Sequence, residues 1–357
     1  MNLVLTGGFL GSGKTTAIVH ACQYLMAKGK RVAVITNDQG DQQVDSAYTK
    51  SLGINTREVS NGCFCCRFDE LDVHLRTLAE ENKPEVVFAE SAGSCTDLVA
   101  TIAKPLRLFK PDINVIISVF ADAPLLISLI EGRASFLEES VRYIYKKQLE
   151  EADIIVLNKI DLLSESQLAS AHRVIQDEYK AKTIIHQNSL KNEDIIAWID
   201  LLDQFAFQED RDSLMVDYSV YGDGEAQLAW LDKSIIIKSP LGNGGYVARN
   251  VIRSIFNSLK QQQFTIGHLK FFAETDQWTN KISLTTASTS ADFKINEEDI
   301  KELRLLINAR VQTDPTTLQT LIDGVIKSAP MFDGCTIITE KQSAFSPGFP
   351  VPTHRME

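Results

Sequence analysis

The feature that most constrains the fold is a glycine-rich loop near the start of the sequence. Residues 8–15 read Gly-Phe-Leu-Gly-Ser-Gly-Lys-Thr and fit the pattern Gly-x4-Gly-Lys-Thr, which cradles phosphate groups. The apolar run 3–5 precedes the loop and residues 15–19 follow it, as a strand and a helix would. Glycines let successive backbone N–H groups converge on phosphate oxygens, and the helix N-terminus adds the positive end of its dipole. Both flanks match the required context, so a chance Lys-Thr after a glycine-rich turn is a poor explanation.

Short apolar runs rich in Val and Ile recur after this loop and alternate with helix-length segments. They lie at residues 31–36, 85–89, 114–119 and 153–157. Fully buried parallel strands have this composition. The alternation predicts an α/β fold: a P-loop NTPase with a mostly parallel sheet covered by helices, and with its ligand at the carboxyl ends of the strands. We expect this P-loop GTPase domain to cover residues 1–205.

The residue pattern changes after the polar stretch 208–213. Residues 214–221 and 228–238 flank Gly222-Asp223-Gly224 and predict a β-hairpin around an Asp-Gly turn. Further on, the pattern predicts a helix, three strands and a helix capped by Asp314 with Pro315 at its first position, at residues 247–262, 266–273, 281–286, 303–311 and 314–327. We expect two further parts of the chain, a smaller C-terminal α+β domain at residues 214–340 and an extended Pro-rich tail at residues 341–357.

Composition limits the class of function. Hydrophobic residues make up 44% and charged residues 23% of the 357 residues, so there is enough apolar surface to bury. The net charge of −11 disfavours a nucleic-acid partner, because phosphate binding needs a basic face. The most apolar long stretch, residues 113–130, is interrupted by Asn114, Asp122 and Pro124, which argues against a membrane span. Residues 1–6 lack the features of a signal peptide, so we expect a cytoplasmic protein.

The glycine-rich loop and the next strand end form the first predicted site. Lys14 would pair with the β- and γ-phosphates of a nucleotide, and the Thr15 hydroxyl would reach Mg²⁺. The predicted phosphate contacts come from Gly8, Gly11, Ser12, Gly13, Lys14, Thr15 and Thr16. Glu90 ends an apolar run and can hold Mg²⁺ or its water shell, while the amide of Gly93 can sense a γ-phosphate. We predict Lys14, Thr15 and Glu90 as catalytic residues; the plain alternative for Glu90 is an exposed side chain at a strand end.

A second segment predicts which base is bound. Asn158-Lys159-Ile160-Asp161 follows a buried strand, where an open α/β sheet presents its ligands. The Asp161 carboxylate can accept both the ring N–H and the exocyclic amine of guanine, and adenine offers no such pair of donors. Asn158, Lys159 and Asp161 therefore predict GTP and GDP as ligands. A solvated loop is the alternative interpretation.

Three of the six cysteines, Cys63, Cys65 and Cys66, lie within four residues. They are too close together for three strain-free mutual disulfides, and their crowding suits metal or thiol chemistry in a reducing compartment. Thiolates bind soft or borderline metals such as Zn²⁺ or Cu(I). The motif lacks a fourth ligand of its own, which suits a site that passes its metal on. Buried cysteines acting as small hydrophobic residues are the alternative.

Together these motifs resemble the CobW family of metallochaperone-type GTPases, relatives of the UreG and HypB nickel-enzyme maturation proteins. The resemblance covers about residues 1–205 and rests on the phosphate loop, Asn37-Asp38, Gly62-Cys63-Phe64-Cys65-Cys66, Glu90-x-x-Gly93 and Asn158-Lys159-Ile160-Asp161-Leu162. It implies weak intrinsic GTP hydrolysis coupled to delivery of a metal, often zinc or cobalt, or to assembly of a metalloenzyme.

The sequence departs from the family pattern in two places. The family commonly has Asn-Glu-Phe-Gly-Glu where this chain has Asn37-Asp38-Gln39-Gly40-Asp41, so the carboxylates are one methylene shorter. We expect Asp38 to bind Mg²⁺ or Zn²⁺, and Asp38 with Asp41 to complete the thiolate set in one nucleotide state; Cys95 is a further candidate. The His-rich stretch of many members is missing, and the six histidines are scattered, which disfavours bulk metal storage.

These features predict a slow GTPase and metallochaperone that couples its nucleotide state to delivery of Zn²⁺ or cobalt. The expected partner is a client metalloprotein or cofactor enzyme; a homo-oligomer stays open, and neither nucleic acid nor a membrane is expected. The alternative is a GTP-dependent assembly or reactivation chaperone of a cofactor enzyme, such as a corrinoid enzyme, without metal transfer. A third possibility is an ATP-using P-loop enzyme with a small-molecule substrate. Slow turnover is expected because no glutamine or arginine identifies itself as a water-positioning group or an arginine finger.

Overall fold

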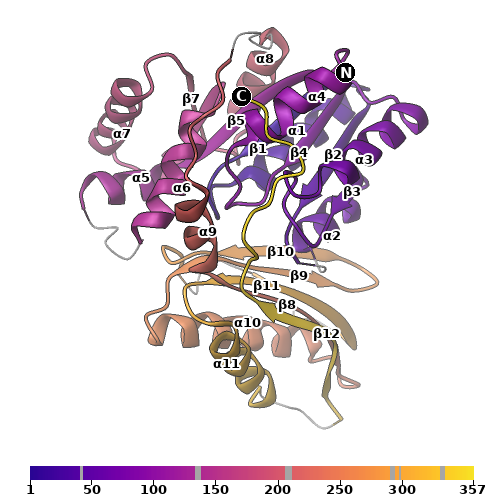
Figure 1. The fold of residues 1–357 in the computed structure, drawn as a ribbon. Coiled ribbons are helices and arrows are strands. Elements are labelled where there is room, and N and C mark those ends of the chain that lie inside the picture. The colour runs from indigo at the N-terminus through magenta and orange to yellow at the C-terminus, as the bar shows by residue number, and fades with distance from the viewer. Residues whose placement is uncertain (41–42, 133–137, 206–210, 290–293, 297–298, 330–333) are drawn as a thin grey trace. The chain divides into compact units, whose positions relative to one another are not determined.

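The computed structural model describes residues 1–40, 43–132, 138–205, 211–289, 294–296, 299–329 and 334–357 (Figure 1). The chain divides into two compact units. The first contains residues 1–39, 53–224 and 349–357, and the second contains residues 40–52 and 225–348. The sequence-based domain boundaries at residues 205, 214 and 340 remain predictions.

The described residues of the first unit form a seven-stranded sheet in the order β3-β2-β4-β1-β5-β6-β7, and every pairing is parallel. The strands are β1 (Asn2–Gly7), β2 (Val32–Asn37), β3 (Asn55–Val59), β4 (Val86–Glu90), β5 (Asn114–Asp122), β6 (Ile154–Asn158) and β7 (Thr183–Gln187). The expected buried strands and their parallel arrangement are confirmed. Parallel strands end at the same edge, so the segments after β1, β2, β4 and β6 gather there.

Helices lie between these strands and after the last of them. They are α1 (Lys14–Ala27), α3 (Phe68–Glu81), the π-helix η1 (Val99–Ala103), α4 (Lys104–Phe109), α5 (Ala123–Ile130), α6 (Glu139–Glu150), the 3₁₀ turn η2 (Ile160–Leu162), α7 (Glu165–Glu178), α8 (Asn192–Gln204) and α9 (Tyr218–Ala226). Trp198 of α8 packs with its ring centroid 5.6 Å from that of Phe88 and 5.2 Å from that of Phe120. Its indole N–H donates to Ser118 Oγ at 3.0 Å, so a large aromatic residue is buried without leaving its polar group unpaired.

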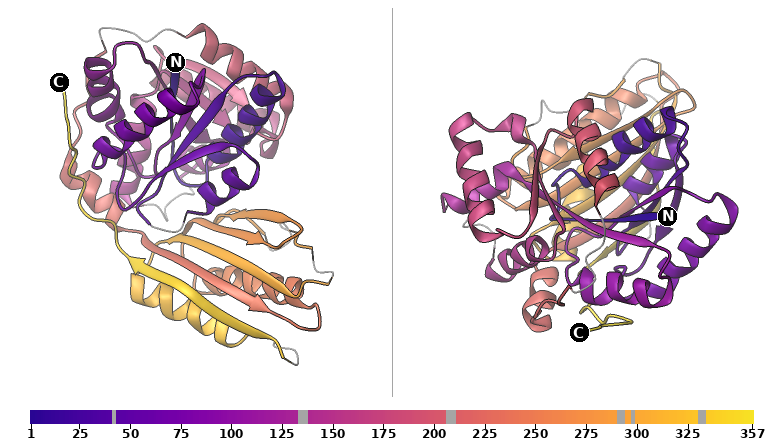
Figure 2. Two further views of the ribbon diagram at one scale, coloured as in Figure 1. Left: turned by 90° about the vertical axis from the view of Figure 1, so that its right-hand side faces the viewer. Right: turned by 90° about the horizontal axis from the view of Figure 1, so that it is seen from above.

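The described residues of the second unit form a five-stranded antiparallel sheet in the order β10-β9-β11-β8-β12. The strands are β8 (Ala229–Lys238), β9 (Ile266–Glu274), β10 (Thr279–Leu284), β11 (Glu302–Val311) and β12 (Thr336–Phe345). Helices α10 (Gly244–Gln261) and α11 (Pro315–Lys327) lie against one face of this sheet, as Figure 2 shows. Asp314 caps α11 by accepting from the Thr317 N–H at 2.9 Å, which confirms the predicted cap.

The expected hairpin at residues 214–238 is wrong. Residues 218–226 form the helix α9, and β8 pairs with β11 and β12 instead. The two glycines of the supposed turn serve close packing. A Cβ on Gly222 would lie 2.5 Å from the Phe349 ring, and one on Gly224 would lie 2.8 Å from the backbone oxygen of Ser140. Both positions suit glycine because neighbouring groups approach the backbone closely there, and not because the chain makes a turn.

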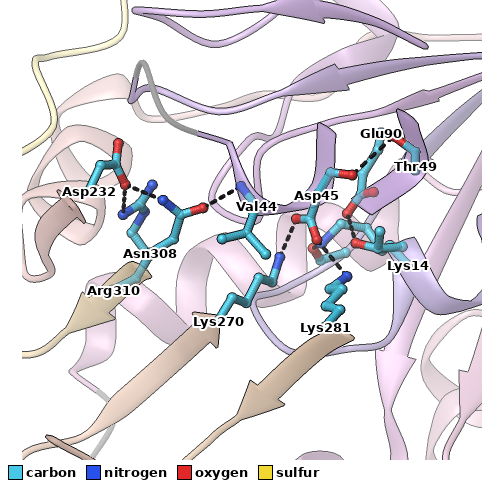
Figure 3. Close-up of polar contacts among 12 residues, drawn as sticks. Lys14, Val44, Asp45, Thr49, Glu90, Asp232, Lys270, Lys281, Asn308 and Arg310 are labelled. Carbon is cyan, nitrogen blue, oxygen red and sulfur yellow. Dashed lines mark hydrogen bonds and ion pairs between the residues drawn. The ribbon is translucent and has the colours of Figure 1, made fainter. Parts of the chain in front are cut away.

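Helix α2 (Val44–Ser51) follows β2 in the sequence but packs within the second unit. Its Asp45 carboxylate forms ion pairs with Lys270 at 2.5 Å and Lys281 at 2.6 Å (Figure 3). The backbone N–H of Val44 donates to Asn308 Oδ1 at 2.8 Å, and Asn308 in turn donates to Asp232. The segment between two strands of the parallel sheet is therefore fastened to the antiparallel sheet, which the sequence pattern did not predict.

Candidate functional site

The phosphate loop lies between β1 and α1. Lys14, the first residue of α1, directs its Nζ back to donate to the backbone oxygen of Gly8 at 2.6 Å. Gly8 has a φ of 124°, and a Cβ there would lie 2.3 Å from the backbone oxygen of Phe120. Gly13 has a φ of 94°, and its Cβ would lie 2.3 Å from Asn158 Nδ2. Both positions therefore require glycine for the backbone conformation and for the close approach.

Two of the three residues predicted to hold Mg²⁺, Thr15 and Glu90, meet beside this loop. Thr15 Oγ1 donates to Glu90 Oε1 at 2.8 Å, and both side chains are buried. Their contact follows from the sheet order, because β4 is the neighbour of β1. A Cβ on Gly93 would lie 2.4 Å from Leu10 Cδ2, so the backbone of Gly93 presses directly on the phosphate loop. The structure brings together Lys14, Thr15, Glu90 and Gly93, as a γ-phosphate and Mg²⁺ site requires.

Residues 158–161, the segment predicted to bind guanine, contact the phosphate loop through Asn158, the buried last residue of β6. Asn158 Nδ2 donates to the backbone oxygen of Ser12 at 2.7 Å. Asp161 lies in η2 and is exposed, so its carboxylate can meet a ligand from solvent. The other predicted phosphate contacts are where a cradle needs them: Gly11 has a φ of 76°, and Thr16 lies in the first turn of α1.

Sequence reasoning missed two residues that contact the segment predicted to bind guanine, residues 158–161. Ser189 donates to Asn158 Oδ1 from its backbone N–H at 3.2 Å and from its hydroxyl at 2.8 Å. Asp122 pairs with Lys159 at 2.6 Å and caps α5. Asp122 was visible in the sequence as a carboxylate that ends an apolar run, whereas Ser189 follows β7 without any motif.

The three clustered cysteines lie on the turn between β3 and α3. Their sulfur atoms all lie within 4.8 Å of one another, with Cys63 Sγ 2.9 Å from Cys65 Sγ and 3.2 Å from Cys66 Sγ. Hydrogen bonds from the side chains of Cys65, Cys66 and Cys95 lower the pKa of the Cys63 thiol well below its usual value. The hydrogen bond with Cys63 raises the pKa of Cys66 to about 11. Binding of a metal ion to thiolates of this cluster would release their thiol protons.

Asn37, the last residue of β2, holds the cysteine turn in place. Its Nδ2 donates to the backbone oxygens of Val59 at 3.2 Å and Gly62 at 2.7 Å, and its Oδ1 accepts from the Phe64 N–H at 2.9 Å. Thr36, one residue earlier, pairs with Glu90 in the sheet. A single amide side chain therefore joins the cysteine turn to the strand that lies beside Glu90, the predicted Mg²⁺ ligand.

The described carboxylate after β2, that of Asp38, does not belong to the same cluster. Asp38 follows Asn37 and its backbone N–H donates to Val59, but its carboxylate lies outside the group of ligand atoms formed by the three cysteines. Asp41 lies outside the described residues. Their predicted role as metal ligands remains a prediction.

Residues 349–357 lie along the cysteine turn. The N–H of Val351 donates to Cys66 Sγ at 3.3 Å, and the N–H of Thr353 donates to the backbone oxygen of Cys65 at 2.8 Å. Arg355 pairs with the buried Asp97 carboxylate at 2.9 Å. The His354 ring packs against Phe68 and Phe109, with centroid separations of 4.9 and 5.4 Å. This extended segment supplies a hydrogen-bond donor to a sulfur atom of the cluster.

The described thiol cluster has the donor chemistry of a soft-metal site. Thiolate sulfurs bind Zn²⁺ at about 2.3 Å, so two sulfurs of a tetrahedral site lie about 3.8 Å apart. The three sulfurs are already gathered on this scale. A three-thiolate set leaves one coordination position open, and such a position can accept a ligand from another residue or another protein.

Comparison with known proteins identifies relatives of the first part of the chain. The family model described as CobW/HypB/UreG, nucleotide-binding domain, matches residues 2–186. The chain is 30% identical over 198 residues to a protein named zinc chaperone CobW from a Sinorhizobium species, covering 49% of this chain and 54% of that protein. It is 28% identical to zinc chaperone YeiR of Escherichia coli K12, covering 51% of this chain and 53% of that protein. The chain thus spans about half the length of the curated relatives it matches.

Among solved structures, HypB from Helicobacter pylori in complex with nickel matches 57% of this chain and 85% of its own, with a TM-score of 0.40 and 16% identity. Among the described residues, no helix is both long enough and apolar enough to cross a membrane.

Proposed function

Because this chain belongs to the CobW/HypB/UreG family, we propose that it is a slow GTPase and metallochaperone that couples its nucleotide state to delivery of a metal ion to a client protein. The observation that carries the proposal is the Asn37 contact. This side chain binds the backbone of the cysteine turn on one side, and its strand neighbour Thr36 pairs with Glu90 on the other. A change at the nucleotide site therefore has a short, hydrogen-bonded route to the thiols.

The nucleotide part of the proposal rests on the loop residues. The backbone amides of the glycine-rich loop and the Lys14 ammonium would hold the phosphates, and Asp161 would accept the two donors of guanine. Thr15 and Glu90 would hold Mg²⁺, which offsets the negative charge of the phosphate oxygens when it is bound. We expect slow turnover in the absence of a partner, because no water-positioning glutamine or arginine is evident.

The metal part of the proposal rests on the thiol cluster. Three clustered cysteines favour Zn²⁺ over the hard cations Mg²⁺ and Ca²⁺, which prefer oxygen ligands. Zinc is also the metal for which the two related chaperones described above are named. Cys63, Cys65 and Cys66 would bind the metal as thiolates, and their thiol protons would pass to solvent.

The client would be a metalloprotein or a cofactor enzyme of the cytoplasm. A protein from Dictyostelium discoideum that is 27% identical over 210 residues, 47% of this chain and 42% of that protein, is named zinc-regulated GTPase metalloprotein activator 1. The acidic net charge of −11 supports a protein partner over a nucleic acid.

A competition titration with a zinc indicator tests this proposal. It would be run on the full chain without nucleotide, with GDP and with a non-hydrolysable GTP analogue. We expect zinc binding that differs among the three forms and that is lost in the double variant Cys65→Ser, Cys66→Ser. The matched control is Cys335→Ser, which replaces a free cysteine of the second unit. Equal zinc affinity in all three forms that survives the double variant would favour the assembly chaperone without metal transfer.

A further inference from the structure

A fourth cysteine lies next to the thiol cluster but comes from a different part of the chain. Cys95 follows β4, two residues after Gly93, and its side chain is buried. Its side chain hydrogen-bonds to that of Cys63. Cys95 does not belong to the group of sulfur atoms that all lie within 4.8 Å of one another. It therefore contacts one member of the cluster without lying close to all three.

The loop that carries Cys95 contacts α6 on one side and the phosphate loop on the other. Gln148 of α6 donates from Nε2 to the backbone oxygens of Gly93 at 3.0 Å and Cys95 at 2.9 Å. On the other side, Gly93 is pressed against Leu10 of the phosphate loop, where a Cβ would lie 2.4 Å from Leu10 Cδ2. A γ-phosphate that attracts the Gly93 amide would act on a backbone only two residues from the Cys95 thiol.

The number of thiolates decides how firmly a zinc ion is held. Four thiolates close the tetrahedral shell, as in structural zinc sites, and three leave one position open. Cys63, Cys65 and Cys66 lie on one turn, so they can stay together as a set of three. Only Cys95 lies on the loop that the phosphate end of the nucleotide would move.

We propose that Cys95 is the fourth metal ligand, and that its loop inserts it into or withdraws it from the metal shell as the nucleotide changes. This inference rests on the proposed metallochaperone function and adds to it the residue through which the nucleotide acts. The step involves no redox change: the Cys95 S–H proton is released to solvent as the sulfur–metal bond forms, and it returns when that bond breaks.

Cobalt and zinc titrations of Cys95→Ser test the proposal. Co²⁺ substitutes for Zn²⁺, and its thiolate-to-metal charge-transfer absorption grows with the number of thiolates. In the wild type we expect a four-thiolate spectrum in one nucleotide form and a weaker, three-thiolate spectrum in the other. Cys95→Ser should lower the stronger absorption by about a quarter, since one thiolate of four is lost. Zinc affinity in that form should fall at least about tenfold, the lower end of what even outer-shell partners contribute.

Folding controls accompany the titrations. Cys95→Ala provides a second variant without an oxygen donor, and retained binding of a fluorescent GDP would show that both variants are folded. Cys335→Ser should leave the spectra and affinities unchanged. If the wild type shows three thiolates in every form and Cys95→Ser matches it, the role of Cys95 is refuted while the metallochaperone function stands. If the wild type shows no cysteine-dependent metal binding, both proposals fail.

Discussion

The phosphate loop and the cysteine turn are held in place by different kinds of contact. The phosphate loop is held by a hydrogen bond within the loop and by strands of the parallel sheet: Lys14 folds back onto Gly8, Gly8 lies against Phe120 of β5, and Gly13 lies against Asn158 of β6. The cysteine turn is held by residues from distant parts of the sequence, among them Asn37, Thr353 and Cys95. The first site is thus enclosed by the parallel sheet itself, whereas the second also depends on the loop after β4 and on residues 349–357. This difference suits a constant nucleotide cradle beside a metal site with adjustable affinity.

The largest effect is expected from a substitution in the phosphate loop. Lys14→Ala should lower GTP turnover by about 10²- to 10³-fold, because the transferred phosphoryl group loses a buried counter-charge. Phosphate release measured at saturating GTP would show it. Lys28→Ala, at the exposed end of α1, is the control and should retain normal turnover. Near-native hydrolysis by Lys14→Ala would mean that the loop is not a nucleotide cradle.

Asp161→Asn tests the base-reading end of the same cradle. The variant loses the acceptor for two guanine donors, so GTP affinity should fall by about 10- to 100-fold, as for loss of one bidentate base contact. Xanthosine triphosphate carries an oxygen in place of the exocyclic amine, so it should bind the variant more tightly than it binds the wild type. Asp177→Asn on the surface of α7 is the control. Equal affinity of the wild type for ATP and GTP would contradict the assignment.

Asn37→Ala tests the externally held cysteine turn. The substitution removes three hydrogen bonds to that turn, so zinc affinity should fall about tenfold, as when an outer-shell partner of a metal site is lost. GDP affinity should change much less, because Asn37 contacts no residue of the phosphate loop among its described bonds. Asn192→Ala, at the exposed start of α8, is the control. A loss of GDP binding equal to the loss of zinc binding would show that the two sites are not built separately.

The loop that carries Cys95 has its own pH-dependent support. The buried Glu151 carboxylate accepts hydrogen bonds from the N–H groups of Leu98 at 2.5 Å and Val99 at 3.4 Å. Burial, together with the nearby charge of Asp97, raises the pKa of Glu151 to about 8. In the unfolded chain this carboxyl has an ordinary pKa of about 4.3. Between about pH 4.3 and pH 8 the folded protein therefore keeps a proton that the unfolded chain releases, and the free energy of unfolding falls as the pH rises through this range.

Glu151→Gln should remove this dependence. Relative to the variant, the free energy of unfolding of the wild type should fall by about 1 kcal/mol per pH unit between pH 5 and pH 8 and then level off. Urea denaturation followed by circular dichroism at several pH values would measure the difference. Parallel curves for the two proteins would show that Glu151 is ionised in the folded state.

Sequence patterns predicted the parallel sheet and the motif residues because both depend on local order along the chain. The apolar runs became β1, β2, β4, β5 and β6, and the contact of Thr15 with Glu90 follows from strand ends that meet at one edge. The patterns failed where long-range contact decided the outcome. Gly222 and Gly224 indicated a turn, but they lie in α9 and allow close contact with Phe349 and with α6. Residues 40–52 carry no motif, so their attachment to the second unit had no local signal.

The external supports of the cysteine turn also had no local signal. Asn37 was noticed only as part of a family pattern, and nothing in its neighbours shows that its amide binds a turn more than twenty residues later. The segment 349–357 was expected to be extended, but its pairing with Cys65 and Cys66 depends on chain ends that approach in space. Cys95 was only one among several candidates for a fourth ligand until its contact with Cys63 was seen.

The central claim is that the nucleotide and metal sites are energetically coupled, and reciprocity of binding tests it most directly. The affinities for GDP and for a non-hydrolysable GTP analogue would be measured with and without saturating Zn²⁺. If GTP changes the zinc affinity by some factor relative to GDP, zinc must change the ratio of GTP to GDP affinity by that same factor. We predict a change of about 5- to 150-fold, the usual range of coupling between two sites. A ratio that zinc leaves unchanged would contradict the account.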